Sequence, residues 1–426
     1  MNYIRFFETV GIDDVALVGG KNASLGEMYQ HLTQLGVNIP NGFSTTRDAY
    51  SLLLAANNLA QRIDLLIAGL DVENVAQLQV CGKAVRELVL NQPLPEELKT
   101  EIITAYQQLS AEYGESMVDV AVRSSATAED LPDASFAGQQ ESYLNIRGEL
   151  SLLIHVRKCF ASLFTDRAIS YRHSRGFDHR QVSLCVGIQK MVRSDLASSG
   201  VMFTLDTQSG NDNVIMINAV FGLGENIVGG RVNPDEFYVF KPTLKENKSA
   251  IIKRQLGSKE MKMIYDDKLK TLNVSTTLNE RARFTLSDEE VITLARHALA
   301  IETHYGKAMD IEWAKDTDKG EFYIVQARPE TVHSKRLNAK VQSIEKYRLS
   351  EEIAQRNCLL SGLAIGEKIG VGVVRVIQDL TEAARFNAGE VLVTDITDPD
   401  WEPLMKKAAA VVTNKGGRTC HAAIVA

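Results

Sequence analysis

Several features that would place a protein outside the ordinary globular class are missing from this chain of 426 residues. No apolar run approaches the roughly 18 residues that a membrane-spanning helix needs, and the amino-terminal MNYIRFFETVGIDD lacks the apolar segment of a signal peptide. The net charge is −7, so the chain has no excess of the basic residues that bind nucleic acid. We therefore expect a soluble, cytoplasmic protein with neither a membrane nor a nucleic acid as its partner.

Cysteine is scarce, with five residues, an odd number, and none of them forms a CxxC pair. This pattern favours reduced thiols over a disulfide framework or a zinc site. The length is sufficient for two or three domains, each with its own hydrophobic core.

Helical patterns dominate residues 1–120, and strand patterns follow them. Capping residues and glycine stops predict helices at 24–36, 95–114 and 288–306, the first with Ser24 as its N-cap. Short apolar runs predict strands from Met117 onward, at Leu184–Val192, Val214–Phe221 and Glu236–Phe240, and at two runs near 309–327. The mixture indicates an α+β or α/β fold.

The last third of the chain divides into a charged segment and a new unit. Residues 331–358 are charged and helix-prone, so we predict a linker between a first domain at 1–330 and a second at 359–426. The second domain begins with a glycine-rich strand pattern and ends at Ala426, a few residues into an expected helix. An apolar residue inside a helix is an unusual place for a domain to end, so we expect this domain to be truncated.

His421 is the first candidate for chemistry. It follows the strand AAAVVT and the glycine turn NKGGR, and Thr419 is a plausible N-cap for the helix CHAAIVA. The free N–H groups and positive dipole at a helix start would stabilise a phosphate on the imidazole and keep the ring neutral and nucleophilic. The residues alone also allow an ordinary histidine with a backbone partner, or, less favourably, thiol chemistry at Cys420.

Two further segments suit the binding of an anion. Gly19 and Gly20 precede Lys21 near a helix start, although the spacing is not that of a P-loop. Arg123 leaves a strand into a polar loop that contains Gly138, where the backbone can approach a phosphate closely. Taken singly, the first segment more often forms a surface turn, and an arginine such as Arg123 more often forms a surface salt bridge.

The segments MDIEWAKD and EFYIVQARP flank TDKG and predict a β-hairpin. With Asp316–Gly320 as the loop, Asp310 lies opposite Gln326 and Glu312 opposite Ile324. Because residues two apart share a face, one face would carry the polar side chains and the other the apolar ones: Asp310, Glu312, Gln326 and Arg328 on the first, and Ile311, Trp313, Tyr323 and Val325 on the second. Two carboxylates and an amide oxygen suit Mg²⁺, and an adjacent arginine suits phosphates. The alternative is a hairpin with one solvated polar face, and a loop one residue longer or shorter would split the group.

These motifs resemble those of the phosphoenolpyruvate-utilising enzymes, and GGRTCHAAIVA with TDITDPDWEPLMKKAAAVVTN resembles the phosphoenolpyruvate synthase branch. RSSATAED, SFAGQQE, MDIEW and VQARPET are similar to the nucleotide-binding segments of that family. The resemblance implies an ATP-grasp-like domain followed by an incomplete swivelling phosphohistidine domain, without the carboxyl-terminal phosphoenolpyruvate/pyruvate barrel. It also implies ATP contacts at Lys21, Arg123, Gly138, Glu225, Gln326 and Arg328, with Gly222 and Gly224 beside Glu225, and Mg²⁺ on Asp310, Glu312 and Gln326.

The reaction that the resemblance implies is gluconeogenic: ATP, pyruvate and water give phosphoenolpyruvate, AMP and phosphate, with His421 carrying the phosphoryl group. We expect this chain to perform the first half, the phosphorylation of His421, and a full-length protein to be a possible homodimer. The alternatives are an enzyme of the pyruvate phosphate dikinase type, which uses phosphate as an acceptor, and a catalytically incomplete ATP-binding module.

Overall fold

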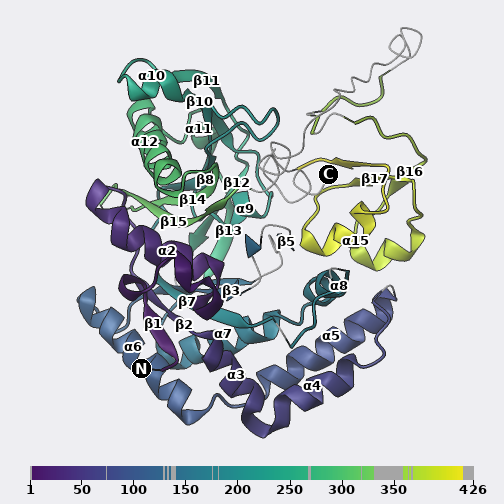
Figure 1. Ribbon diagram of the computed structural model, residues 1–426. Helices are drawn as coiled ribbons and strands as arrows, with labels where there is room; N and C mark the ends of the chain where they lie inside the picture. Colours follow the sequence, from purple (N-terminus) through teal and green to yellow (C-terminus); the bar gives the residue numbers. More distant parts are fainter. Residues whose placement is uncertain are drawn as a thin grey trace.

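The computed structural model describes most of the chain in a mixed α/β fold (Figure 1). The described residues are 2–72, 74–127, 130–131, 134–135, 141–174, 176–180, 182–266, 270–317, 319–330, 358–362, 364–365 and 368–415. Gly138, His421 and nearly all of the predicted linker therefore lie outside the described residues.

The first sheet is antiparallel and packs against a group of helices. Its strands run in the order β1 (Ile4–Phe6), β2 (Gly42–Thr45), β7 (Leu184–Lys190), β3 (Val120–Ala126) and β6 (Ser142–Ile146). The helices that share its hydrophobic core are α3 (Arg47–Ala55), α4 (Leu59–Ile67), α5 (Val75–Leu90), α6 (Glu96–Glu112), α7 (Glu149–Ser162) and α8 (Asp166–Ser174). In Figure 1 these helices occupy the lower part of the molecule.

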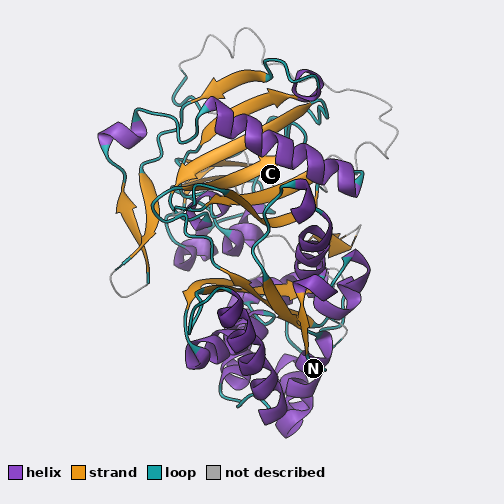
Figure 2. Cartoon of the chain, turned by 90° about the vertical axis from the view of Figure 1, so that its left-hand side faces the viewer, coloured by secondary structure: helices purple, strands orange, loops and turns teal. Residues whose placement is uncertain are grey.

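The second sheet is also antiparallel and packs against two long helices. Its order is β11 (Ile251–Gln255), β10 (Asp235–Phe240), β9 (Val214–Phe221), β8 (Ser198–Phe203), β14 (Met309–Lys315) and β15 (Phe322–Pro329). One face is covered by α12 (Asp288–Tyr305) and α2 (Gly20–His31), whose apolar side chains share a core with Ile311 and Trp313. Figure 2 shows α12 lying across the strands of this sheet. The opposite face carries a smaller apolar cluster, which includes Val201, Met216 and Ile227.

A smaller parallel sheet forms the last unit. It consists of β16 (Val374–Val376), β17 (Val391–Thr394) and β18 (Ala410–Thr413), with the short helix α15 (Glu402–Met405) and a 3-10 helix at Leu380–Arg385. Leu392, Trp401 and Leu404 belong to its core. The unit contacts α8 through Arg167, whose Nη1 lies 3.6 Å from Asp400 Oδ1, and Figure 1 shows the two side by side.

The remaining helices and strands of the described residues are short. The helices among them are α1 (Val15–Val18), α9 (Glu225–Val228), α10 (Lys241–Lys245) and α11 (Leu278–Arg281), and the strands form two pairs, β4 (Asp130–Leu131) with β5 (Ala134–Ser135) and β12 (Met261–Tyr265) with β13 (Thr271–Ser275). No helix of the described segments combines the length and apolar character that crossing a membrane requires. The cysteines among the described residues are free thiols, as the sequence predicts: Cys81, Cys159, Cys185 and Cys358.

The helix predictions hold where capping residues act locally. Helix α6 follows Pro95, and α12 has the predicted stop at Gly306 and a capping box between Ser287 and Glu290. The prediction for α2 is wrong at its start, because the helix begins at Gly20 and not after Ser24. Ser24 is buried inside it and donates to the carbonyl of Ala327 at 2.7 Å, a tertiary bond that the sequence does not reveal.

Candidate nucleotide site

The hairpin of β14 and β15 brings the predicted polar residues to one face. Asp310 pairs with Arg328, and Glu312 pairs with Gln326. The predicted partners, Gln326 for Asp310 and Ile324 for Glu312, are wrong by two residues. A shift of two leaves Asp310, Glu312, Gln326 and Arg328 on the predicted face, so these four polar residues still lie together.

The apolar face of the hairpin differs from the prediction at β15. Between Glu312 and Trp313 the register shifts, because β15 carries one extra residue there, a β-bulge at Val325. Trp313 therefore pairs with Ile324, and the buried side chains of this face on β15 are Phe322, Ile324 and Ala327. The prediction placed Tyr323 and Val325 there, and both are only half-buried.

Each carboxylate of the hairpin is paired with an arginine. Arg328 donates from Nε and Nη2 to Asp310 Oδ2, at 2.9 and 2.8 Å. Arg123 donates from Nη2 to Glu312 Oε2 at 2.9 Å. Among the described residues, no further hydrogen bond reaches Asp310 Oδ1 or Glu312 Oε1. One oxygen of each carboxylate thus remains available to a cation.

Arg123 connects the two large sheets. It projects from the middle of β3 in the first sheet, at the one half-buried position of that strand. Besides Glu312, its guanidinium bonds Gln326 Oε1 at 2.6 Å and the carbonyl of Val325 at 2.8 Å. The bulge turns this carbonyl towards the arginine, because the extra residue is left out of the strand pairing. The structure therefore joins two motifs that the sequence could identify only separately.

Lys21 lies at the start of α2, next to the same strand β3. Its backbone N–H donates to Ser125 Oγ at 3.2 Å, and its Nζ donates to the carbonyl of Ser124 at 3.4 Å. Gly19 makes this approach possible: its φ is +81°, and a Cβ atom there would lie 2.3 Å from Ser125 Oγ. A lysine and a helix N-terminus thus lie beside β3, close along the strand to Arg123, an arrangement suited to an anion.

The electrostatics of the site favour a bound cation. Burial raises the pKa of Asp310 above its ordinary value; Arg328 opposes this change, while Glu312 and Glu330 reinforce it. A carboxyl with a raised pKa among other carboxylates gains most when a cation binds, because the cation offsets both the desolvation and the repulsion.

The structure does not bring Glu225 into this cluster, and two other predicted site residues are not among those it describes. Glu225 is exposed at the start of α9, and no described residue of the cluster bonds to it. Gly138 and His421 lie outside the described residues. A group of three or more His, Cys, Asp or Glu side chains that could hold a metal does not occur within the described ranges; the predicted set has two carboxylates and an amide.

Asn218 and Glu236 extend the polar face across the sheet, and the sequence did not reveal them as neighbours of the site. Glu312 pairs with Val201, Val201 with Asn218, and Asn218 with Glu236, so all four share one face. Glu236 is 4% exposed, and its Oε2 has no hydrogen-bond partner in the described part of the chain. The alternation of DEFYVF could have placed Glu236 and Tyr238 on one face, but nothing in the sequence reveals which strands are neighbours.

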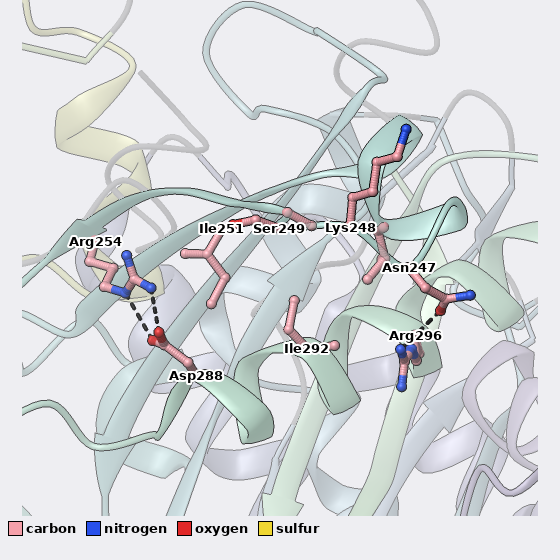
Figure 3. Close-up of a pocket in the computed structure, with 10 residues that line it drawn as sticks. Asn247, Lys248, Ser249, Ile251, Arg254, Asp288, Ile292 and Arg296 are labelled. Carbon is pink, nitrogen blue, oxygen red and sulfur yellow. Dashed lines mark hydrogen bonds and ion pairs between the residues drawn. The ribbon is translucent and has the colours of Figure 1, made fainter.

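A separate surface pocket of about 230 Å³ lies between α10, β11 and α12 (Figure 3). Its charged side chains are held by partners: Arg254 bonds Asp288, and Arg296 bonds Asn247. None of the predicted site residues lines it, and we assign it no function.

Comparison with known proteins agrees with the geometry. Residues 15–349 match the family described as pyruvate phosphate dikinase, AMP/ATP-binding domain, and residues 386–426 match the PEP-utilising enzyme mobile domain. The phosphoenolpyruvate synthase of Helicobacter pylori is 54% identical over 435 residues, which cover 100% of this chain and 54% of that protein. That of Escherichia coli is 52% identical, covering 99% of this chain and 53% of its own length. A probable phosphoenolpyruvate synthase of Methanocaldococcus jannaschii is 43% identical, and the match covers 99% of this chain and 34% of that protein. The chain spans about half the length of its bacterial relatives.

Proposed function

The chain belongs to the pyruvate phosphate dikinase AMP/ATP-binding family, in the form found in phosphoenolpyruvate synthases, and on this premise we propose that it uses ATP to phosphorylate His421. In the whole protein this step is the first half of a reaction that converts ATP, pyruvate and water into phosphoenolpyruvate, AMP and phosphate. The setting is the cytoplasm and the pathway is gluconeogenic.

The observation that carries the proposal is the position of Arg123 between the two sheets. Its guanidinium bonds Glu312, Gln326 and the Val325 carbonyl, and Lys21 lies at the end of the same strand. We assign the two sheets to an ATP-grasp-like domain in which Lys21, Arg123 and Arg328 hold the phosphates. These three side chains come from three elements, and three positive charges offset the charge of a triphosphate far better than one surface arginine would.

The residues of the hairpin also fit Mg²⁺. Asp310, Glu312 and Gln326 offer oxygen ligands alone, as Mg²⁺ prefers, and both carboxylates have an oxygen that no described residue bonds. When bound, the metal ion would neutralise charge on the phosphates. The role of the chain itself is to orient those phosphates through the arginines and to keep Asp310 ionised by its contact with Arg328.

His421 then attacks the β-phosphorus of ATP through a ring nitrogen, and AMP leaves. The terminal phosphate is subsequently lost to water, and the phosphoryl group remains on the histidine. What supports His421 is the match of residues 386–426 to the PEP-utilising mobile domain together with the glycine turn before it. Gly138 and Glu225 are assigned to the ATP site on the family match of residues 15–349.

The test is transfer of label from ATP carrying ³²P at the β position, in the presence of Mg²⁺. Wild-type chain should acquire acid-labile label, because phosphohistidine hydrolyses in acid, and His421→Ala should acquire none. His173→Ala is the matched control, because His173 is an exposed histidine on α8 outside the proposed site, and it should label as the wild type does.

Two other outcomes would redirect the proposal. ATP binding with no label on the wild type would indicate a binding module that does not transfer the phosphoryl group. Labelling that becomes faster or more complete when inorganic phosphate is added would favour the pyruvate phosphate dikinase type, in which phosphate accepts the terminal phosphoryl group.

A further inference from the structure

Arg172, in the last turn of α8, is a buried arginine that the proposed reaction does not use. It is 2% exposed, and none of its three guanidinium nitrogens has a hydrogen-bond partner in the part of the chain that the structure describes. A guanidinium carries five N–H donors, so all of its hydrogen-bonding capacity is unmet here.

Two aromatic residues are found near Arg172: Phe164, through its ring, and Tyr50, whose charge would act on the guanidinium. The guanidinium carbon lies 5.5 Å from the ring centre of Phe164. Tyr50 of α3 is also 2% exposed, packs against Phe160 with 5.5 Å between ring centres, and has a hydroxyl without a hydrogen-bond partner among the described residues. Two side chains, Arg172 and Tyr50, therefore have hydrogen-bond donors without acceptors and lie against the aromatic rings of Phe164 and Phe160.

Among the described residues, no counter-charge lies near Arg172. Burial lowers the pKa of Arg172 to about 10, which still leaves it protonated at neutral pH, and within the described residues Tyr50 is the one ionisable group whose field acts on it. Burial raises the pKa of the Tyr50 hydroxyl, so the tyrosine stays neutral and cannot serve as the counter-ion.

Neighbouring arginines show how this region normally satisfies a guanidinium. Arg86 of α5 bonds Asp166 at 2.9 Å and the carbonyl of Phe164 at 2.8 Å. Arg167, which precedes Arg172 on α8, bonds Glu141 at 3.3 Å. An isolated buried charge is strongly unfavourable, because it loses its hydration and gains neither a partner nor hydrogen bonds in return.

We propose that Arg172 and the Tyr50 hydroxyl form a buried binding site for a small monovalent inorganic anion, of the class of chloride. The guanidinium supplies the opposite charge and several donors, and the hydroxyl of Tyr50 supplies one more donor from α3. Because the two donors belong to α8 and α3, the bound anion ties these helices together. The proposal is independent of the function assigned to the nucleotide site.

Thermal unfolding of the full chain at constant ionic strength tests the proposal, with gluconate replaced stepwise by chloride. The melting temperature of the wild type should rise with chloride and then saturate, because a ligand that binds only the folded state stabilises it. Arg172→Met, of similar length without the charge, should show no chloride dependence. Tyr50→Phe should keep the dependence with an apparent affinity about tenfold weaker, the loss of one hydrogen bond.

Arg86→Met is the matched control, since it removes a paired arginine from the same bundle, and it should respond to chloride as the wild type does. A wild type indifferent to chloride, or an Arg172→Met variant that keeps the full response, would overturn the proposal. A saturable response to phosphate alone would overturn the assignment to a monovalent anion. If Arg172→Met does not fold, crystals soaked in bromide decide: anomalous density beside Arg172 supports the site, and an ordered water there refutes it.

Discussion

Arg123 is the residue on which the proposed ATP site depends most. Its planar fork reaches three acceptors through two separate nitrogens, Nη1 and Nη2, and the compact ammonium of a lysine does not reproduce that geometry. Arg123→Lys should therefore reduce the rate of His421 labelling by about 100-fold, the size of effect seen when one positioned donor to a transition state is lost. The measurement is single-turnover labelling together with the dissociation constant for ATP.

Arg147→Lys is the control for that substitution, because Arg147 makes a surface ion pair with Glu115 at 3.4 Å. Pairs of this kind contribute little, so its labelling rate should match the wild type. Equal rates for the two variants would show that Arg123 has no role beyond that of a surface arginine.

The backbone geometry at Gly19 predicts how much stability an alanine there would cost. An alanine there would have to adopt a φ of +81° and would place its Cβ 2.3 Å from Ser125 Oγ. Gly19→Ala should lower the free energy of unfolding by about 2–4 kcal/mol, from strain and steric overlap together, and should weaken ATP binding by displacing Lys21.

Gly148→Ala separates these two causes. Gly148 has nearly the same backbone, with φ +85° and ψ 150° against φ +81° and ψ 158° at Gly19, but a Cβ atom there would meet only Met117 Sδ, at 3.4 Å, an ordinary contact. Its substitution should therefore cost only about 1–2 kcal/mol, the strain of the backbone alone. Urea unfolding monitored by circular dichroism gives both values. Equal losses at the two positions would mean that the contact with Ser125 is unimportant.

At the scale of elements, some features follow from the sequence and others do not. The polar face of the hairpin is predictable, because strand alternation is local, and the ends of α12 are predictable, because Ser287 and Gly306 act on their own helix. The bulge at Val325 and the true start of α2 are not, because each depends on distant partners. Arg123 lies 202 residues from Val325, and Ser24 lies 303 residues from Ala327.

The parallel sheet of the last unit contains an acid-sensitive ion pair. Arg375 of β16 bonds both oxygens of Glu390, which precedes β17, and Nη2 lies 2.5 Å from Oε1. This arginine, with the backbone of Asn387, lowers the pKa of Glu390 from 4.5 to about 2. A lowered folded-state pKa means that the stability contributed by Glu390 is present above pH 4.5 and is lost as the pH falls towards 2.

Glu390→Gln should therefore be less stable than the wild type at neutral pH, and the difference should shrink as the pH falls through that window. Urea unfolding at a series of pH values, followed by Trp401 fluorescence, measures it. Glu382→Gln is the control, since Glu382 forms only an i,i+3 surface pair with Arg385. A stability difference for Glu390→Gln that is constant with pH would contradict this assignment.

At the scale of the whole molecule, the unit that leads to His421 contacts the nucleotide-binding part through α8. Arg167 bonds Glu141 and also faces Asp400 of the last unit at 3.6 Å. Asp400→Arg would place two positive charges at this contact, and the rate of labelling should fall roughly five- to tenfold, since reversing one surface pair changes the energy by about 1 kcal/mol.

Glu382→Arg changes the net charge of the same unit equally but leaves the pair between Arg167 and Asp400 intact, and it should label at the wild-type rate. The affinity for ATP should be unchanged in both variants, because neither residue belongs to the proposed phosphate site. If Asp400→Arg labels normally, the contact with α8 plays no part in bringing His421 to ATP.

The most direct test of the central claim compares two positions of label in ATP on the wild-type chain. With ³²P at the β position, the protein should retain acid-labile label that disappears in His421→Ala. With ³²P at the terminal position, the label should end as free phosphate. Stable label on the protein from the terminal position, or β label that survives the loss of His421, would contradict the account.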